Sequence, residues 1–315
     1  MLKVGIVGVG YLGKFHVEKY SMIDSVEIAA ICDSNETTAK EIAKKYRANL
    51  TTDYKDLIKF GINCASIATT TATHYEIAKY LLENGIDLLI EKPITSSYQT
   101  ALELINIAKR NNRIIQVGHL ERFNPAFQKF NSLANHPRFF EIKRLSTFVG
   151  RGIDVDVIKD LMIHDIDLLL SVATSPIKNI DAVGTPVITD SVDIANVRVV
   201  FESGVMANLT ASRVSLSPER SFRVFQKDSY LSIDLGKKTA KKYSKIENST
   251  GIGEISSEQI EVESGDSLFE QIQHFIKCVK DRETPIVSGE DGAEALRVAE
   301  LINNQISEKI KELKL

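Results

Sequence analysis

The chain begins with an apolar run that ends in three spaced glycines. In KVGIVGVGYLGK, Gly8, Gly10 and Gly13 follow a predicted strand and lead into a predicted helix. Such spacing permits a tight turn at the first glycine, a close backbone approach to a ligand at the second and close helix packing at the third. The helix N-terminus supplies N–H donors and a partial positive charge, which suit phosphate groups. This stretch therefore predicts the first strand–turn–helix unit of a dinucleotide-binding sheet.

An acidic residue ends the second predicted strand. Asp33 lies 20 residues after Gly13 and is followed by Ser34. A carboxylate at that point accepts both ribose hydroxyls of an adenosine and repels a 2′-phosphate. We therefore predict NAD as the cofactor, in preference to NADP, and expect Tyr11 and Leu12 of the glycine-rich turn to lie beside it.

Apolar strands and amphipathic helices alternate from residue 2 to about residue 117. Helices are predicted at 37–46, 74–84 and 97–111. Continuously apolar strands separated by helices are typical of an α/β fold with a parallel sheet covered on both faces. After about residue 123 the strands alternate apolar and polar residues and are joined by tight turns, which indicates an antiparallel or mixed sheet.

Length and composition limit the class of protein. A chain of 315 residues is too long for one small core, and we predict domains at 1–122 and 123–315. A net charge of −3 without a basic block argues against nucleic acid as a partner. No window reaches the roughly 18 apolar residues of a membrane span. Cys32, Cys64 and Cys278 form no CxxC pair, so we expect reduced thiols in a cytoplasmic protein and no metal site.

The stretch KDLMIHDIDLLL combines apolar character with charge. At about 100° per residue of an α-helix, Asp160, His164 and Asp167 fall within a stripe about 60° wide. Asp165 points elsewhere. Almost all of the remaining circumference is apolar, so this stripe either faces an internal cleft or belongs to a helix end with solvated acids and a histidine bonded in the core. Both interpretations stay open on this stretch alone.

A lysine follows the predicted strand in LLIEKPI. Ligands of doubly wound sheets bind outside the carboxyl ends of the strands, so Lys92 should reach the cofactor crevice. The neighbouring Pro93 stiffens the turn. A surface lysine would be the ordinary alternative.

Three motifs in order, GxGxxG, EKP and DLMIHDID, resemble those of the glucose-fructose oxidoreductase, inositol dehydrogenase and MocA family (Gfo/Idh/MocA). The resemblance extends over essentially the whole chain. It implies an N-terminal Rossmann domain and a C-terminal α+β domain with a large open, mainly antiparallel sheet, for substrate binding and assembly into a homo-dimer or homo-tetramer. It also implies oxidation or reduction of a sugar-like alcohol with a nicotinamide cofactor.

The same resemblance implies catalytic roles for Lys92, Asp160 and His164. An imidazole that titrates near neutrality suits removal of a hydroxyl proton, so His164 is the candidate general base. Lys92 would stabilise the developing charge on the oxygen, and Asp160 would orient the substrate or the histidine. Lys92 acting as the base is the alternative assignment. The chain has Met162 where the family often has a glycine, which leaves the spacing of Asp160 and His164 intact.

Cofactor contacts are also implied by the resemblance. They fall on five residues: Thr69, Thr70, His74, Glu91 and Lys92. Many members have a proline where this chain reads ATTTATH. By the same resemblance we expect the Lys92–Pro93 peptide to be cis, a geometry that costs little only before proline.

The stretch VGHLERFNPAF carries the clearest information on the substrate. Together with DLMIHDIDLLL it is similar to the branch that contains UDP-N-acetylglucosamine 3-dehydrogenases, which oxidise the sugar C3 hydroxyl to a ketone for a partner aminotransferase. Arg122, and Arg151 in VGRGID, are candidates for a diphosphate because guanidinium groups suit phosphate oxygens. A salt bridge is the alternative for Arg122. Three further residues are predicted on the substrate side: His119, Asn124 and Asp167.

Two other functions fit the same sequence. One is a dehydrogenase of a different free sugar or cyclitol. The other is a non-catalytic, nicotinamide-dependent sensor, since a fold alone does not establish a reaction. The presence of Lys92, Asp160 and His164 argues against the sensor.

Overall fold

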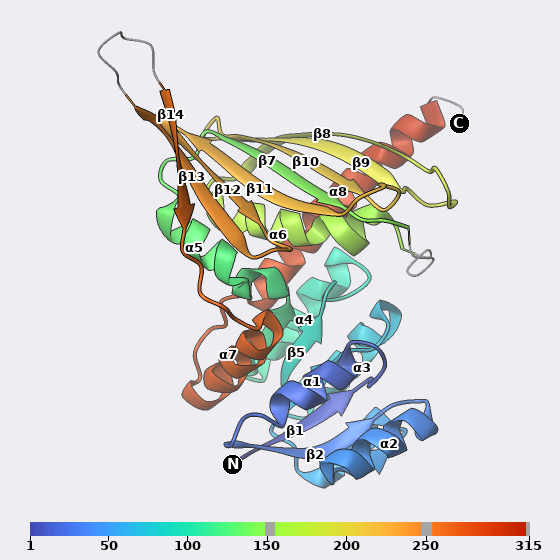
Figure 1. Cartoon of the computed structure of the whole chain (residues 1–315). Helices are drawn as coiled ribbons and strands as arrows, with labels where there is room; N and C mark the ends of the chain where they lie inside the picture. Colours follow the sequence, from blue (N-terminus) through green and yellow to red (C-terminus); the bar gives the residue numbers. More distant parts are fainter. Residues whose placement is uncertain (149–154, 247–253, 313–315) are drawn as a thin grey trace. The chain divides into compact units, whose positions relative to one another are not determined.

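The computed structural model describes residues 1–148, 155–246 and 254–312 (Figure 1). The chain divides into two compact units. The first comprises Met1–Leu120 and Asp266–Arg297, and the second comprises Glu121–Gly265 and Val298–Leu315. This division departs from our single boundary after residue 122, because a late segment of the chain packs with the N-terminal sheet.

A six-stranded parallel sheet forms the centre of the first unit. Its order is β3-β2-β1-β4-β5-β6, so the direction of strand addition reverses between β1 and β4. Ligands of such sheets bind at this reversal, outside the carboxyl ends of the strands. The strands are β1 (Leu2–Val7), β2 (Val26–Cys32), β3 (Asn49–Thr51), β4 (Cys64–Ile67), β5 (Asp87–Glu91) and β6 (Ile115–Gly118). The predicted parallel Rossmann sheet is confirmed.

Helices follow the strands of this sheet. Asn35 caps one of them by accepting a hydrogen bond from the Thr38 N–H at 3.2 Å, and Ser97 caps another through the Thr100 N–H at 3.3 Å. Each such cap contributes about 1 kcal/mol. The elements are α1 (Gly13–Tyr20), α2 (Glu36–Tyr46), the 3-10 helix η1 (Tyr54–Phe60), α3 (Thr71–Glu83), α4 (Tyr98–Arg110) and α7 (Ser267–Asp281).

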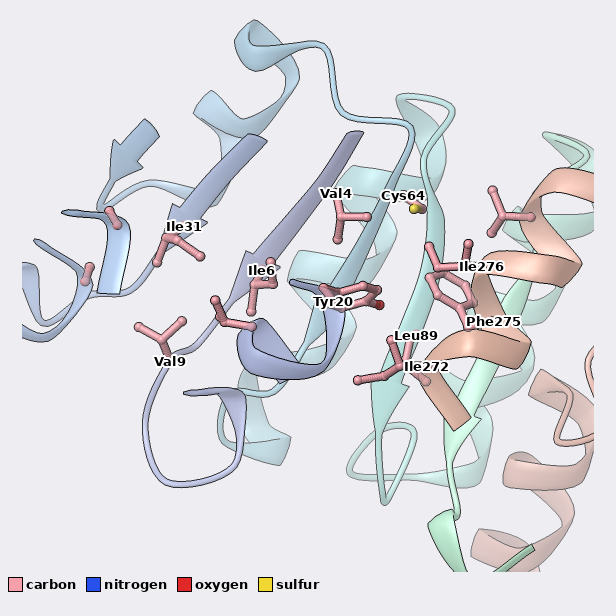
Figure 2. Packing of buried hydrophobic residues seen from close by; sticks show 14 residues of the cluster. Val4, Ile6, Val9, Tyr20, Ile31, Cys64, Leu89, Ile272, Phe275 and Ile276 are labelled. Atoms are coloured by element: carbon pink, nitrogen blue, oxygen red, sulfur yellow. The ribbon is translucent and has the colours of Figure 1, made fainter. Parts of the chain in front are cut away.

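Helix α7 belongs to the core of the first unit although it comes late in the chain. Figure 2 shows Ile272, Phe275 and Ile276 of α7 in the same buried cluster as Tyr20 of α1 and Leu89 of β5. An amphipathic helix removes its apolar face from water by packing in this way. This burial is the physical reason why residues 266–297 return to the N-terminal unit.

The second unit is built on an eight-stranded sheet. Its order is β14-β13-β12-β11-β7-β10-β9-β8, and among the described strand pairs of this sheet only β7–β10 is parallel. The strands are β7 (Phe139–Leu145), β8 (Ile177–Thr185), β9 (Ile194–Phe201), β10 (Met206–Ser212), β11 (Glu219–Gln226), β12 (Ser229–Asp234), β13 (Thr239–Ile246) and β14 (Glu254–Ile260). The predicted large, mainly antiparallel sheet is confirmed.

Helices of the second unit cover one face of this sheet (Figure 1). Phe127 and Phe130 pack there against Phe222, which also contacts Phe140, with ring centroids of neighbouring pairs 5.2–5.9 Å apart. The helical elements are η2 (Leu120–Phe123), α5 (Pro125–Leu133), the π-helical turn η3 (Ile158–Met162), α6 (Ile163–Val172) and the part of α8 (Gly289–Glu312) that belongs to this unit. Among the described helices, none is long and apolar enough to cross a membrane.

Candidate active site

The three glycines of the N-terminal turn differ in whether the fold would tolerate a side chain at their position. Gly8 has φ of +82°, and a Cβ there would lie 2.7 Å from the Ala68 carbonyl oxygen. A Cβ on Gly13 would lie 1.9 Å from the Gly8 carbonyl oxygen. A Cβ on Gly10, by contrast, would meet no protein atom within 4 Å. The fold therefore requires the first and third glycines, whereas the second leaves open space at the N-terminus of α1.

Asp33 is anchored to this turn. Its Oδ2 accepts a hydrogen bond from the Val9 N–H at 2.7 Å, and its Oδ1 accepts one from the Asn35 N–H at 2.9 Å. A carboxylate oxygen has two lone pairs, so each oxygen keeps capacity for a further donor. Ser34 beside it is exposed. The predicted acid thus lies at the end of β2, directly against the glycine-rich turn.

The loops after β4 and β5 are joined by one histidine. His74, in the first turn of α3, is buried, with Nδ1 3.0 Å from the Pro93 carbonyl oxygen and Nε2 3.2 Å from that of Thr69. Burial lowers the pKa of this imidazole. Thr69 also accepts a hydrogen bond from the Thr73 hydroxyl at 2.8 Å, and Thr70 is the residue before α3. A neutral imidazole carries one N–H, so His74 donates a hydrogen bond to one of these two carbonyls and packs against the other.

Lys92 lies directly after β5, and the Lys92–Pro93 peptide is cis, as expected. Glu91 before it is buried, and its carboxylate bonds to His16 at 3.0 Å inside the unit. The predicted cofactor contact of Glu91 gains no support from this arrangement. His119, after β6, is fully buried, and its N–H donates to the Val117 carbonyl at 2.8 Å.

The stretch predicted as one α-helix has two parts. Residues Ile158–Met162 form the π-helical turn η3, in which the Ile163 N–H donates to the Ile158 carbonyl five residues back, and α6 follows. Our α-helical spacing therefore does not hold between Asp160 and His164, because a π turn is wider than an α turn. Such turns occur frequently at functional sites. Asp160 and His164 are both half-buried.

Asp167 and Asp165 bind arginines on different sides of α6. The Arg122 guanidinium donates from Nε and Nη2 to the two oxygens of Asp167, at 2.8 and 3.0 Å. This bidentate pair supports the salt-bridge alternative for Arg122, since its planar fork already meets a carboxylate. Asp165 is bound by Arg144, from β7, at 2.8 Å. Asp165 and Asp167 thus meet different arginines, Arg144 and Arg122.

Arg144 is the centre of a buried charged cluster that the sequence did not indicate. Its Nε and Nη2 bind Asp165, and its Nη1 binds Glu121 at 3.1 Å. All three side chains are buried. Asn124 donates to Glu121 at 2.9 Å, and its own side-chain oxygen caps α5 through the Ala126 N–H at 3.1 Å. The side chain of Asn124 is thus engaged in holding α5. The predicted residue Arg151 lies outside the described residues.

Known proteins resemble this chain over nearly its full length. Residues 2–119 match the oxidoreductase family with an NAD-binding Rossmann fold, and residues 130–231 match the Gfo/Idh/MocA C-terminal domain. The chain belongs to the Gfo/Idh/MocA family of oxidoreductases. This membership confirms the family predicted from the motifs at Gly8, Lys92 and His164.

Relatives within the Gfo/Idh/MocA family act on more than one kind of substrate. The UDP-N-acetylglucosamine 3-dehydrogenase of Acidithiobacillus ferrooxidans is 33% identical over 95% of both chains. Its solved structure, named GnnA, is 32% identical, has a TM-score of 0.89 and covers 97% of each chain. The myo-inositol 2-dehydrogenase of Thermotoga maritima is 24% identical over 98% of this chain and 97% of its own.

The glycine-rich turn fits the nicotinamide dinucleotide of the Gfo/Idh/MocA family. The open space at Gly10 and the N-terminus of α1 suit a pyrophosphate, and Asp33 suits a ribose. Within the described part of the chain, no group of three or more His, Cys, Asp and Glu side chains could hold a metal ion.

A matched pair of glycine variants separates folding from cofactor binding. Gly10→Ala should change the free energy of unfolding by less than about 0.5 kcal/mol, because its Cβ meets no protein atom. It should nevertheless weaken NAD binding about tenfold or more, equivalent to about 1.4 kcal/mol, because the methyl group occupies the pyrophosphate space. Gly13→Ala should destabilise the fold by about 1–3 kcal/mol or more through its backbone clash. Urea unfolding and calorimetric titration with NAD measure both quantities, and unaltered NAD binding by Gly10→Ala would contradict the assignment.

Proposed function

We propose that the protein is an NAD-dependent dehydrogenase that oxidises the C3 hydroxyl of UDP-N-acetylglucosamine to a ketone. The observation that carries this proposal is the 33% identity, over 95% of both chains, to an enzyme named for that reaction. The stretches VGHLERFNPAF and DLMIHDIDLLL agree with it, since they are similar to the same branch of the family.

We propose three catalytic residues for this reaction. Loss of hydride from an alcohol carbon requires loss of the hydroxyl proton, and His164 accepts that proton as general base. Lys92 donates a hydrogen bond to the same oxygen and stabilises its developing negative charge. Asp160, four residues before His164 in the chain, orients the substrate or the imidazole. The bound nicotinamide supplies the hydride acceptor. The alternative, with Lys92 as the base, predicts a different pH dependence, which is considered in the Discussion.

The cofactor proposal depends on Asp33. A carboxylate bonds the ribose hydroxyls of NAD, and its charge repels the 2′-phosphate of NADP. The anchoring of Asp33 by Val9 and Asn35 supports this role, because it fixes the carboxylate beside the glycine-rich turn.

Asp33→Ala should weaken NAD binding by about 1.5–3 kcal/mol, the usual range for hydrogen bonds to a charged group. NADP binding should weaken less, because the substitution also removes a repulsion. Asp33→Asn is the matched control, since it removes the charge and keeps an acceptor for the Val9 N–H. Fluorescence titrations with both cofactors measure the two dissociation constants. Equal weakening of NAD and NADP would show that the ribose assignment is wrong.

The substrate proposal is tested with a panel of compounds. NADH formation is followed with UDP-N-acetylglucosamine, UDP-glucose, N-acetylglucosamine, myo-inositol and scyllo-inositol, in the presence and absence of an aminotransferase that consumes the ketone. We expect turnover only with the UDP-sugars, and the highest kcat/KM with UDP-N-acetylglucosamine. No NADH from UDP-N-acetylglucosamine, even with the aminotransferase, would reject the proposed substrate.

A second candidate function is a cyclitol dehydrogenase. The 24% identity to the Thermotoga maritima myo-inositol 2-dehydrogenase over 98% of this chain favours it. UDP alone distinguishes the two candidates. Protection of the protein against heat by UDP supports a nucleotide sugar, whereas turnover of an inositol without such protection supports the cyclitol.

We also propose that the protein forms a homo-dimer or homo-tetramer through the second unit. Four aromatic side chains stack across neighbouring strands, with ring centroids 5.7, 5.1 and 4.3 Å apart along the row. They are Phe139, Phe225, Tyr230 and Tyr243. All four are half-buried and alternate along their strands with residues of the helix-covered face. Sedimentation equilibrium of the full chain measures the mass, and a monomer at micromolar concentration would contradict the proposal.

A further inference from the structure

Four polar side chains form a hydrogen-bonded chain inside the first unit. The Tyr20 hydroxyl lies 2.8 Å from the Ser66 hydroxyl, which lies 3.2 Å from His16 Nδ1. His16 Nε2 lies 3.0 Å from Glu91 Oε1. Tyr20, Ser66 and His16 are 0% exposed and Glu91 is 5% exposed. The four residues come from α1, β4 and the end of β5, and Figure 2 shows Tyr20 within the buried cluster.

With His16 neutral, one arrangement of the protons satisfies all four members of this hydrogen-bonded chain. Among the described residues, Ser66 is the hydrogen-bond partner of the Tyr20 hydroxyl, so this phenol donates to it. Burial raises the pKa of Tyr20 well above its usual value, so the phenol keeps its proton. The Ser66 hydroxyl then donates to His16 Nδ1. A neutral imidazole that accepts at Nδ1 carries its proton on Nε2 and donates it to the Glu91 carboxylate.

The hydrogen-bonded chain of side chains ends at the backbone N–H of Lys92. Glu91 Oε2 accepts from the Lys92 N–H at 3.4 Å, and the carbonyl oxygen of Pro93 on the other side lies 3.0 Å from His74 Nδ1. A Cβ on Gly118 would lie 2.6 Å from Glu91 Oε1 and 2.7 Å from Oε2. A side chain at position 118 is therefore incompatible with this carboxylate position. Groups from α1, α3, β4 and β6 thus converge on the three residues around Lys92.

We infer that His16 and Glu91 are positioning residues for Lys92. This inference rests on the proposed role of Lys92 in the reaction. The directional chain fixes the Glu91 carboxylate, and the carboxylate fixes the backbone from which the lysine side chain extends. A reacting group displaced by about 1 Å costs roughly 10²-fold in rate, so loss of this support should lower kcat far more than it weakens NAD binding.

Three variants separate positioning from stability. His16→Leu removes the donor and leaves the Glu91 carboxylate buried without it, which destabilises the protein. The double variant His16→Leu with Glu91→Met removes the carboxylate as well and should recover most of that stability, because no buried charge is left. His16→Gln keeps an N–H that can reach Glu91. Thermal unfolding and NAD titration are measured for each variant, together with kcat and KM for UDP-N-acetylglucosamine.

We expect the double variant to be folded, to bind NAD within a few-fold of the wild type and to have a kcat lowered about 10- to 100-fold. His16→Gln should keep kcat within a few-fold of the wild type. A double variant with wild-type kcat, alongside an inactive Lys92→Met, would overturn the inference and leave the proposed function intact. An active Lys92→Met would overturn the proposed role of Lys92 and the inference with it.

A measurement without substrate tests the direction of the hydrogen-bonded chain. In protein labelled with ¹⁵N-histidine, long-range ¹H–¹⁵N correlation distinguishes the two neutral tautomers and the imidazolium. We expect His16 to carry its proton on Nε2, and Glu91→Gln to alter that resonance. A proton on Nδ1, or an imidazolium at neutral pH, would overturn the proposed arrangement.

Discussion

Replacing His164 with alanine should lower kcat about 10²- to 10⁴-fold, the usual contribution of a general base. The imidazole takes the hydroxyl proton as hydride leaves, and an alanine has no group that can do so. NAD binding should be unchanged, because the cofactor contacts that we propose lie on the first unit, around Gly10 and Asp33. Steady-state kinetics with UDP-N-acetylglucosamine and titration with NAD measure the two effects.

The pH–rate profile decides which residue is the base. The acidic limb of kcat/KM in the wild type reports the essential base of the free enzyme. If His164 is that base, this limb should disappear in His164→Ala and persist in Lys92→Met. The reverse result would assign the base to Lys92, and an unchanged kcat in His164→Ala would contradict His164 as the base.

Replacing Arg144 with methionine should destabilise the protein by about 3–5 kcal/mol, because breaking a buried ion pair leaves uncompensated charge. Here two buried carboxylates, Asp165 and Glu121, would lose their shared partner. Burial already raises the pKa of Asp165, and it opposes the lowering effect of Arg144. The loss of stability in the variant, relative to the wild type, should therefore become smaller as the pH is lowered, since protonation of the two carboxylates removes their unpaired charge.

Urea unfolding of the full chain at several pH values measures the stability of the variant relative to the wild type. Arg220→Met is the matched control, because Arg220 is 54% exposed and lies 3.9 Å from Glu121. Its loss should cost no more than about 1 kcal/mol, as for other exposed ion pairs. Equal effects of the two substitutions would contradict the assignment of the cluster as a buried, stabilising network.

Local patterns were sufficient to predict the first sheet and its ligand-binding turn. Gly13 is required by a backbone contact with Gly8 in the same turn, and Asp33 follows a mostly apolar strand. Strand β3 (Asn49–Thr51) and the 3-10 helix η1 (Tyr54–Phe60) were missed, because three residues of strand and one of the rarer helices carry almost no periodicity.

Such local patterns could not predict contacts between residues that are distant in the sequence. The spacing of Asp165 and Asp167 shows that they point in different directions, but Arg144 and Arg122 are identified only by the fold. The return of α7 to the first unit was missed for the same reason, since its apolar face would suit either core. A signal for His16 did exist. It is a polar residue on the apolar face of α1, three residues after Gly13.

The most direct test of the proposed reaction follows the hydrogen that leaves the sugar. UDP-N-acetylglucosamine carrying deuterium at C3 is incubated with the protein, NAD and an aminotransferase that removes the ketone, and the reduced nicotinamide is analysed by mass spectrometry. We predict one deuterium in each NADH formed. NADH that forms without deuterium, or no NADH at all, would contradict oxidation at C3.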